Sequence, residues 1–283
     1  MNPPEASASL AQTLNSLQAQ GVDRLDAQRL LLHALGKSTH ERAWLLAHDS
    51  DPLSVMARQR LDTLVQRHQQ GEPMAYLTGQ QEFYGLDLQV DARVLVPRPD
   101  TETLVDWALS LLPLAPGRVL RVLDLGTGSG AIALALKATR PDLQVSAIDA
   151  SRAALEVARA NAQRLGLDVT WQQGHWFSPV NGRHDLIVSN PPYIAAQDHH
   201  LAALRHEPLQ ALASGADGLD DIRHIVSQAH ACLHPGGWLL LEHGYQQAPA
   251  VRALLLAAGF TNVQSRRDLC GIERCSGGQS AAV

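Results

Sequence analysis

Residues 119–136 read VLRVLDLGTGSGAIALAL. The apolar run up to Leu125 predicts a buried strand, Gly126, Gly128 and Gly130 predict a tight turn, and the alanine- and leucine-rich segment that follows predicts a helix. A strand, a glycine-rich turn and a helix in this order are typical of nucleotide sites in α/β proteins, because the turn lets the backbone approach the ligand. The stretch therefore predicts an α/β fold built on a parallel sheet.

The chain after this stretch continues the alternation of strands and helices. Apolar runs predict strands at 145–149, 169–172, 185–189 and 238–242, and helical periodicity predicts helices at 155–165, 220–233 and 249–258. Residues 261–264 and a short segment near Ile272 are expected to complete the sheet. The small, polar residues from Ser276 to Val283 are expected to be disordered.

The chain before this stretch has a different pattern. Residues 10–70 show repeated helical spacing of leucine and alanine, which predicts a small helical bundle, and alternating residues 86–90 predict a hairpin. We therefore expect a helical recognition domain at 1–72, a hairpin linker at 73–97, an α/β domain at 98–276 and a disordered tail at 277–283. A purely structural lid is the alternative role for the helical domain.

Bulk composition narrows the class of protein. The chain has 283 residues, is 45% hydrophobic and has a net charge of −5, so it is globular and has no general attraction for polyphosphate. It lacks an apolar run of membrane-spanning length and a secretory signal after Met1, so we expect a cytoplasmic protein. Its three cysteines form no C-x-x-C pair. His199 and His200 lack metal-ligand spacing, and we expect no metal site.

The residues around the glycine turn predict a cofactor that contains a nucleoside. Asp149 ends the second strand about 20 residues beyond Gly130, where a carboxylate accepts hydrogen bonds from ribose hydroxyls. NAD is one possibility. Asp124, directly before the turn, would repel a pyrophosphate and would suit the cationic end of S-adenosylmethionine. Asp124 could instead cap N–H groups of the loop.

The segment Ser189-Asn190-Pro191-Pro192-Tyr193-Ile194 follows the buried run at 185–188, at the strand edge where open α/β sheets bind ligands. Asn190 offers a carboxamide oxygen, Pro191 a backbone carbonyl and Pro192 a fixed φ, while Tyr193 adds an aromatic face. Two adjacent acceptors suit a planar –NH2 group. The alternative is an ordinary turn that closes a strand.

Together, VLDLGTGSG and SNPPYI resemble the motifs of class I S-adenosylmethionine-dependent methyltransferases. Further motifs are similar to those of the PrmC (HemK) family of release factor glutamine methyltransferases: PRPDTE at 97–102, Tyr76-Leu77-x-Gly79, Glu207-Pro208 and Gly218-Leu219. The resemblance implies a Rossmann-like, seven-stranded sheet. It also implies that S-adenosylmethionine is converted to S-adenosylhomocysteine, and that the substrate is the glutamine of a Gly-Gly-Gln loop in peptide chain release factors.

The resemblance also implies roles for individual residues. The cofactor would contact Gly126, Thr127, Gly128, Ser129, Gly130, Asp149, Trp176 and Asn190, and the substrate would contact Asn190, Pro191, Pro192 and Tyr193. Asn190 and Pro191 would be catalytic, each accepting one N–H of the amide. Relatives usually carry an acidic residue just before the aromatic position, whereas this chain has His175.

The sequence leaves several alternative functions open. A DNA or RNA amino-methyltransferase would also use an N-P-P-Y loop, acting on adenine N6 or cytosine N4, but the acidic net charge disfavours it. A non-catalytic cofactor-binding adaptor is a second alternative. The chain's own Gly277-Gly278-Gln279 indicates either chance or self-methylation. We expect a monomer.

Overall fold

The computed structural model describes residues 8–113 and 117–281, which divide into two compact units that meet at Gly79 and Gln80. We call them the helical unit and the sheet unit. This boundary lies later than the expected one at residue 72. Leu77 explains the difference, because it is 3% exposed and packs in the core of the helical unit. The predicted hairpin belongs to the sheet unit.

The helical unit contains five helices, most of which begin at a polar capping residue. They are α1 (Leu10–Ala19), α2 (Arg24–Ala34), α3 (Arg42–Ala47), α4 (Val55–Gln69) and α5 (Met74–Thr78). Ser9, Asp23 and Ser54 each accept a backbone N–H in the first turn of α1, α2 and α4. Leu30, Leu31 and other apolar side chains fill the space between the helices.

The sheet unit contains a seven-stranded sheet in the order β5-β4-β3-β6-β7-β9-β8. β9 is antiparallel to both of its neighbours, β7 and β8, and the other four pairs of adjacent strands are parallel. A separate hairpin of β1 (Gln80–Phe83) and β2 (Leu86–Gln89) precedes it. The strands of the large sheet are β3 (Arg121–Leu125), β4 (Gln144–Asp149), β5 (Thr170–Gln173), β6 (His184–Ser189), β7 (Leu233–Glu242), β8 (Thr261–Arg267) and β9 (Glu273–Gln279).

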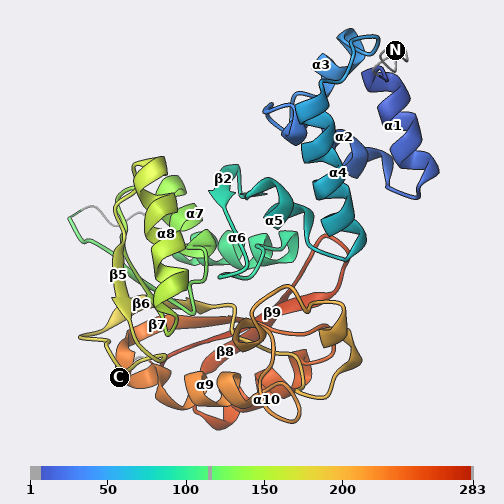
Figure 1. Ribbon diagram of the computed structural model, residues 1–283. Helices are drawn as coiled ribbons and strands as arrows, with labels where there is room; N and C mark the ends of the chain where they lie inside the picture. Colours follow the sequence, from blue (N-terminus) through green and yellow to red (C-terminus); the bar gives the residue numbers. More distant parts are fainter. Residues whose placement is uncertain (1–7, 114–116, 282–283) are drawn as a thin grey trace, which may run out of the picture. The chain divides into compact units, whose positions relative to one another are not determined.

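Helices cover both faces of this sheet. Helices α6 (Glu102–Leu111), α7 (Ala131–Thr139) and α8 (Arg152–Leu165) lie on one face, and α9 (Asp220–Cys232) and α10 (Ala248–Ala257) lie on the other (Figure 1). Leu123 and Leu125 of β3 pack toward α9 and α10 and are almost fully buried. The short 3-10 helices η1 (Pro99–Thr101), η2 (His199–Ala202) and η3 (Leu209–Ala211) lie in the connecting segments.

The expectation of a disordered tail from Ser276 is wrong for residues 276–281. Gly277 and Gly278 belong to β9 and pair with Leu240 and Leu239 of β7. Their lack of a side chain reflects close packing, since a Cβ on Gly278 would lie 2.7 Å from Phe260 Cβ. Small residues that resembled a flexible tail therefore form the strand between β7 and β8.

The order of the strands places the glycine turn beside the N-P-P-Y segment. β3 and β6 are adjacent and parallel, with Leu125 opposite Ser189, and Ser189 Oγ donates to Leu125 O at 2.7 Å. Gly126 and Asn190 therefore emerge next to each other at the carboxyl edge of the sheet. Chain connections diverge on either side of this point, which is where α/β sheets bind ligands.

Candidate active site

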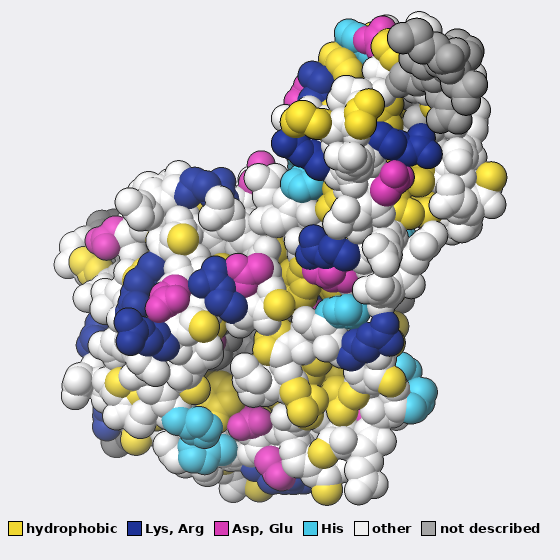
Figure 2. Space-filling view, in the orientation of Figure 1, with side chains coloured by type: hydrophobic (Ala, Val, Ile, Leu, Met, Phe, Trp, Pro, Cys, Tyr) yellow, Lys and Arg dark blue, Asp and Glu magenta, His cyan; other side chains and the backbone are white. Residues whose placement is uncertain are grey.

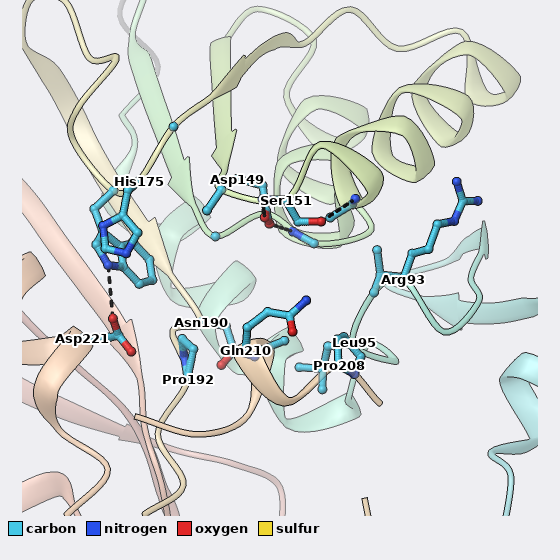
Figure 3. Close-up of a pocket in the computed structure, with 18 residues that line it drawn as sticks. Arg93, Leu95, Asp149, Ser151, His175, Asn190, Pro192, Pro208, Gln210 and Asp221 are labelled. Atoms are coloured by element: carbon cyan, nitrogen blue, oxygen red, sulfur yellow. Dashed lines mark hydrogen bonds between the residues drawn. The ribbon is translucent and has the colours of Figure 1, made fainter. Parts of the chain in front are cut away.

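A cavity opens at the carboxyl ends of β3, β4 and β6. Gly126, Gly128, Asp149, Trp176 and Asn190, all predicted from the sequence, line it. Figure 3 shows Asp149 and Ser151 facing Asn190, Pro192 and Gln210 across the cavity, with His175 and Asp221 at one end and Arg93 at the other. Segments far apart in the sequence thus converge on one site.

Hydrogen bonds to β4 and within the loop fix the conformation of the glycine turn. The N–H groups of Gly126 and Thr127 both donate to Ile148 O at 2.9 Å, and the Gly130 N–H donates to Thr127 O. The Gly128 N–H donates to Asp149 Oδ2 at 2.9 Å. A pyrophosphate site needs such N–H groups free. The turn is therefore unsuited to NAD and fits a ligand that lies against it through its nucleoside.

The structure separates the predicted cofactor residues into two groups. Gly126 and Gly128 line the cavity, whereas Thr127, Ser129 and Gly130 lie behind it and are buried. Thr127 Oγ1 donates to Asp124 Oδ2 at 2.6 Å. The second group contributes to the conformation of the loop.

Asp124 supports the glycine turn from behind the cavity. Its side chain is fully buried, binds Thr127 and does not line the cavity. Burial raises the pKa of Asp124 to about 7. Its Oδ1 has no hydrogen-bond partner within the described part of the chain. Asp124 thus supports the loop through the Thr127 hydroxyl, and its position outside the cavity lining argues against direct attraction of a cationic ligand.

Asp149 is held as an acceptor in the cavity wall. Oδ1 accepts the Ser151 N–H at 2.8 Å, and Oδ2 accepts the Gly128 N–H. Burial raises the pKa of Asp149, while these two bonds favour the charged form. Each oxygen of a carboxylate can accept a second hydrogen bond, so the group can still bind two vicinal hydroxyls.

Trp176 forms the aromatic wall of the cavity. It is 9% exposed, has a positive φ of 48°, and donates from Nε1 to Asp221 Oδ1 at 3.2 Å. Asp221 lies at the start of α9, 45 residues away, and nothing in its local sequence marks it as a site residue. A Cβ at Gly126 would lie 3.3 Å from Trp176 Cζ3. Glycine at 126 thus leaves room for this ring.

His175, at the position where the resemblance implies an acidic residue, lies at the same end of the cavity. It is exposed, and its ring centroid lies 5.7 Å from that of Trp176 and 5.8 Å from that of His224. Asp221, in the first turn of α9, supplies a carboxylate at this end of the cavity.

Asn190 lies between two cavities. It lines the one just described and also a second cavity that contains Arg98, Tyr193 and Leu212. Asn190 Nδ2 donates to Thr101 Oγ1 at 3.2 Å, which leaves Oδ1 as the acceptor. Pro192 lines the first cavity and Tyr193 the second, whereas Pro191 is buried and lines neither.

Tyr193 is anchored by its hydroxyl group. Oη donates to Glu242 Oε1 at 3.3 Å, and burial raises the pKa of Tyr193. Arg98 in the second cavity is paired with the buried Glu207, which also accepts the Val96 N–H at 3.1 Å. Thr101 and Glu242 were not identified as site residues from the sequence, although Thr101 lies within the PRPDTE motif.

Gln279 lies far from this site in the sheet. It pairs with Trp238 of β7, which lies level with Leu186 near the amino end of β6, whereas the cavity lies beyond the carboxyl ends of the strands. Its Nε2 donates to Gly236 O, and its Oε1 accepts from Asn262 Nδ2, both at 2.8 Å. This placement supports chance as the origin of the Gly-Gly-Gln tripeptide.

The neighbouring Asp198, His199 and His200 have ligand atoms within 4.8 Å of one another. Asp198 accepts the His200 N–H and caps η2, and both histidines are exposed. The capping role of Asp198 at η2 accounts for the closeness of these three side chains.

The fold and site define a class I S-adenosylmethionine-dependent methyltransferase. Solved structures share the fold of the sheet unit. One is a methyltransferase from Pyrococcus furiosus, with a TM-score of 0.53 and 20% identity over 70% of this chain and 90% of that one. Another is the hMettl16 catalytic domain in complex with a 3′UTR hairpin, with a TM-score of 0.57 and 16% identity over 71% and 78%.

The sequence comparisons define the particular family. Residues 8–79 match the PrmC N-terminal domain, and residues 107–267 match the methyltransferase small domain. Release factor glutamine methyltransferases are similar over nearly the whole chain. That of Bordetella pertussis is 52% identical over 91% of this chain and 95% of its own, and that of Burkholderia pseudomallei is 48% identical over 99% of each. The chain belongs to the release factor glutamine methyltransferase family.

No helix within residues 8–113 and 117–281 is long and apolar enough to cross a bilayer.

Proposed function

We propose that this protein methylates the side-chain amide nitrogen of the glutamine in the Gly-Gly-Gln motif of peptide chain release factors. The proposal rests on membership of the family and on one observation, the position of Asn190 between two cavities. The first cavity has the residues that suit an adenosine, and the second is largely apolar. A donor and an amide entering from opposite sides would meet at Asn190.

The residues of the first cavity fit S-adenosylmethionine. Asp149 would bind the ribose hydroxyls, Trp176 would flank the adenine, and Gly126 and Gly128 of the turn would lie against the nucleoside. Gly126 supports this fit, since a side chain there would crowd the Trp176 ring. When bound, the cofactor supplies an electrophilic methyl group on a sulfonium.

The second cavity and the N-P-P-Y segment would hold the glutamine. An amide nitrogen is a poor nucleophile because its lone pair is delocalised into the carbonyl group. Asn190 Oδ1 and the Pro191 carbonyl would each accept one N–H and align the nitrogen with the methyl group, while Pro192 fixes the backbone and Tyr193 borders the glutamine. After transfer, the nitrogen loses a proton to water.

Surface charge supports a protein substrate over a nucleic acid. On the face of the sheet unit drawn in Figure 2, basic and acidic side chains alternate. Arg93 Nη2 lies 2.7 Å from Asp91 Oδ2. Arg152 Nε lies 3.4 Å from Glu156 Oε1. Such pairing weakens the field that a phosphate backbone would require. We further propose that the helical unit recognises the release factor and that the protein acts as a cytoplasmic monomer.

The test is transfer of a radiolabelled methyl group, offered in parallel to a release factor and to oligonucleotides. We expect label on the release factor alone, at the Gly-Gly-Gln glutamine. Asn190→Ala should lower kcat about a hundredfold, as loss of one preorganised polar contact does in other enzymes. Label on the oligonucleotide alone would refute the release factor as the substrate. Near-normal turnover by folded Asn190→Ala would refute the proposed role of Asn190.

A further inference from the structure

Behind the N-P-P-Y segment lies a group of buried polar side chains with no role in the proposed chemistry. Thr101, at the end of η1, is 3% exposed and accepts a hydrogen bond from Asn190 Nδ2. Glu242, the last residue of β7, is 1% exposed and accepts the Tyr193 hydroxyl on Oε1. Both ends of the segment thus bond to buried polar side chains behind it.

The hydrogen-bonding requirements of this group are incomplete. Glu242 Oε2 is buried and has no partner among the described residues. The Thr101 hydroxyl accepts from Asn190, and its own hydrogen also needs an acceptor. The Thr101 side chain interacts with Glu242 and favours its charged form. Turning the Thr101 hydrogen toward Glu242 satisfies both groups at once.

We propose that Glu242 is a positioning residue that acts on Asn190 through Thr101. By accepting the Thr101 hydrogen, Glu242 directs a lone pair of Oγ1 at Asn190 Nδ2. This bond fixes the carboxamide with Oδ1 toward the incoming amide, instead of the flipped orientation that would present an N–H to it. The inference rests on the proposed role of Asn190.

This arrangement requires the ionised form of Glu242. A carboxylate is an acceptor only, so it can receive both the Thr101 and the Tyr193 hydroxyls, whereas a protonated carboxyl must itself donate. Burial raises the pKa of Glu242 to about 7, and the two hydroxyls favour the charged form. The titratable and charged groups that act on Glu242 from the surrounding elements are Asp100, Tyr193, Arg274 and Cys275.

The first test compares Thr101→Val with Thr101→Ser in steady-state methylation of a release factor. Valine keeps the shape and removes the hydroxyl, so we expect kcat to fall about tenfold, the order expected for one misdirected polar contact. Serine keeps the hydroxyl and should retain kcat within about threefold. The Kd for S-adenosylhomocysteine should be unchanged in both. A normal kcat in folded Thr101→Val would overturn the proposal.

The second test asks whether Thr101 acts through Asn190. In an Asn190→Ala background, Thr101→Val should have no further effect on single-turnover methylation, because the group that it orients is gone. An additional tenfold loss in that background would overturn the proposal. If Asn190→Ala alone turned over normally, the proposed function of Asn190 would fail first, so the two failures are distinguishable.

The third test uses pH. The kcat of the unmodified enzyme should fall about tenfold in total as the pH drops through the pKa of Glu242, because protonation removes the same contact that Thr101→Val removes. Glu242→Gln should lower kcat and abolish this inflection, because its amide cannot titrate. Asp124→Asn removes another buried carboxyl with a raised pKa and should keep the inflection. An inflection that persists in Glu242→Gln would overturn the proposal.

Discussion

Gly277→Ala tests whether the Gly-Gly-Gln tripeptide of this chain is a packing feature. Gly277 lies in β9, opposite Leu240 of β7. A Cβ there would lie 2.5 Å from Leu240 Cδ2, 2.6 Å from Leu239 O and 2.9 Å from Trp107 Cη2. The leucine tip can rotate away, but the Leu239 carbonyl is part of β7 and can move only with the strand. The substitution must therefore separate β7 from β9 locally.

The magnitude follows from these contacts. Overpacking a filled interior costs about 1–3 kcal/mol, and a weakened ladder hydrogen bond adds about 1 kcal/mol. Reduced freedom of the unfolded chain offsets about 0.5 kcal/mol, which leaves a net loss of about 1.5–3.5 kcal/mol. For a unit of this size we expect the Tm to fall by roughly 3–14 °C.

Scanning calorimetry of the full chain is the appropriate assay, because the two units can unfold in separate transitions. Only the transition of the sheet unit should move. Gly259→Ala is the matched control, since it has a φ of +88° and nothing within 4 Å of its Cβ. It should lose only about 1 kcal/mol for the left-handed conformation. A Gly277→Ala transition equal to or above that of the control would refute the packing argument.

Three further substitutions test the cofactor site. Gly126→Ala should raise the Kd for S-adenosylhomocysteine about tenfold, because the φ of +71° at this position and the Trp176 ring both oppose a side chain. An unchanged Kd, measured by titration calorimetry, would contradict this expectation. Asn161→Ala should lower the free energy of unfolding in urea by about 3 kcal/mol, because the buried amide makes two hydrogen bonds to Gln89 and one to Ser129 of the glycine turn. A loss below about 1 kcal/mol would contradict this expectation. Trp176→Phe keeps a ring but loses the bond to Asp221, and should raise the same Kd about fivefold; full affinity would dismiss that bond.

The sequence predicted those features of the fold that depend on local pattern. The run ending at Leu125, the glycine turn and the helix after it were correct because strand burial and glycine φ leave local signals. The parallel sheet then implied that Gly126 and Asn190 would meet at one edge, and the pairing of Leu125 with Ser189 confirms it. Helix starts at Ser9 and Ser54 have equally local causes.

Features that depend on contacts between distant residues could not be read in the same way. Asn190 and Thr101 are 89 residues apart, and Tyr193 and Glu242 are 49 apart. Nothing in the apolar run that ends β7 distinguishes Glu242 as a buried acceptor. Gly277 was misread for a related reason, because small residues look the same whether they are disordered or packed against another strand.

The proposed role of Asn190 uses both ends of its carboxamide. Toward the protein, Nδ2 donates to Thr101 Oγ1, a bond that an aspartate could not make. A second carboxylate would also face the buried Glu242 through Thr101, at a desolvation cost that only protonation could relieve. Toward the proposed substrate, a neutral carboxamide oxygen would accept an N–H without competing for the methyl group as a charged nucleophile would. Asn190→Asp should therefore be as damaging as Asn190→Ala, although it keeps the shape and an acceptor oxygen.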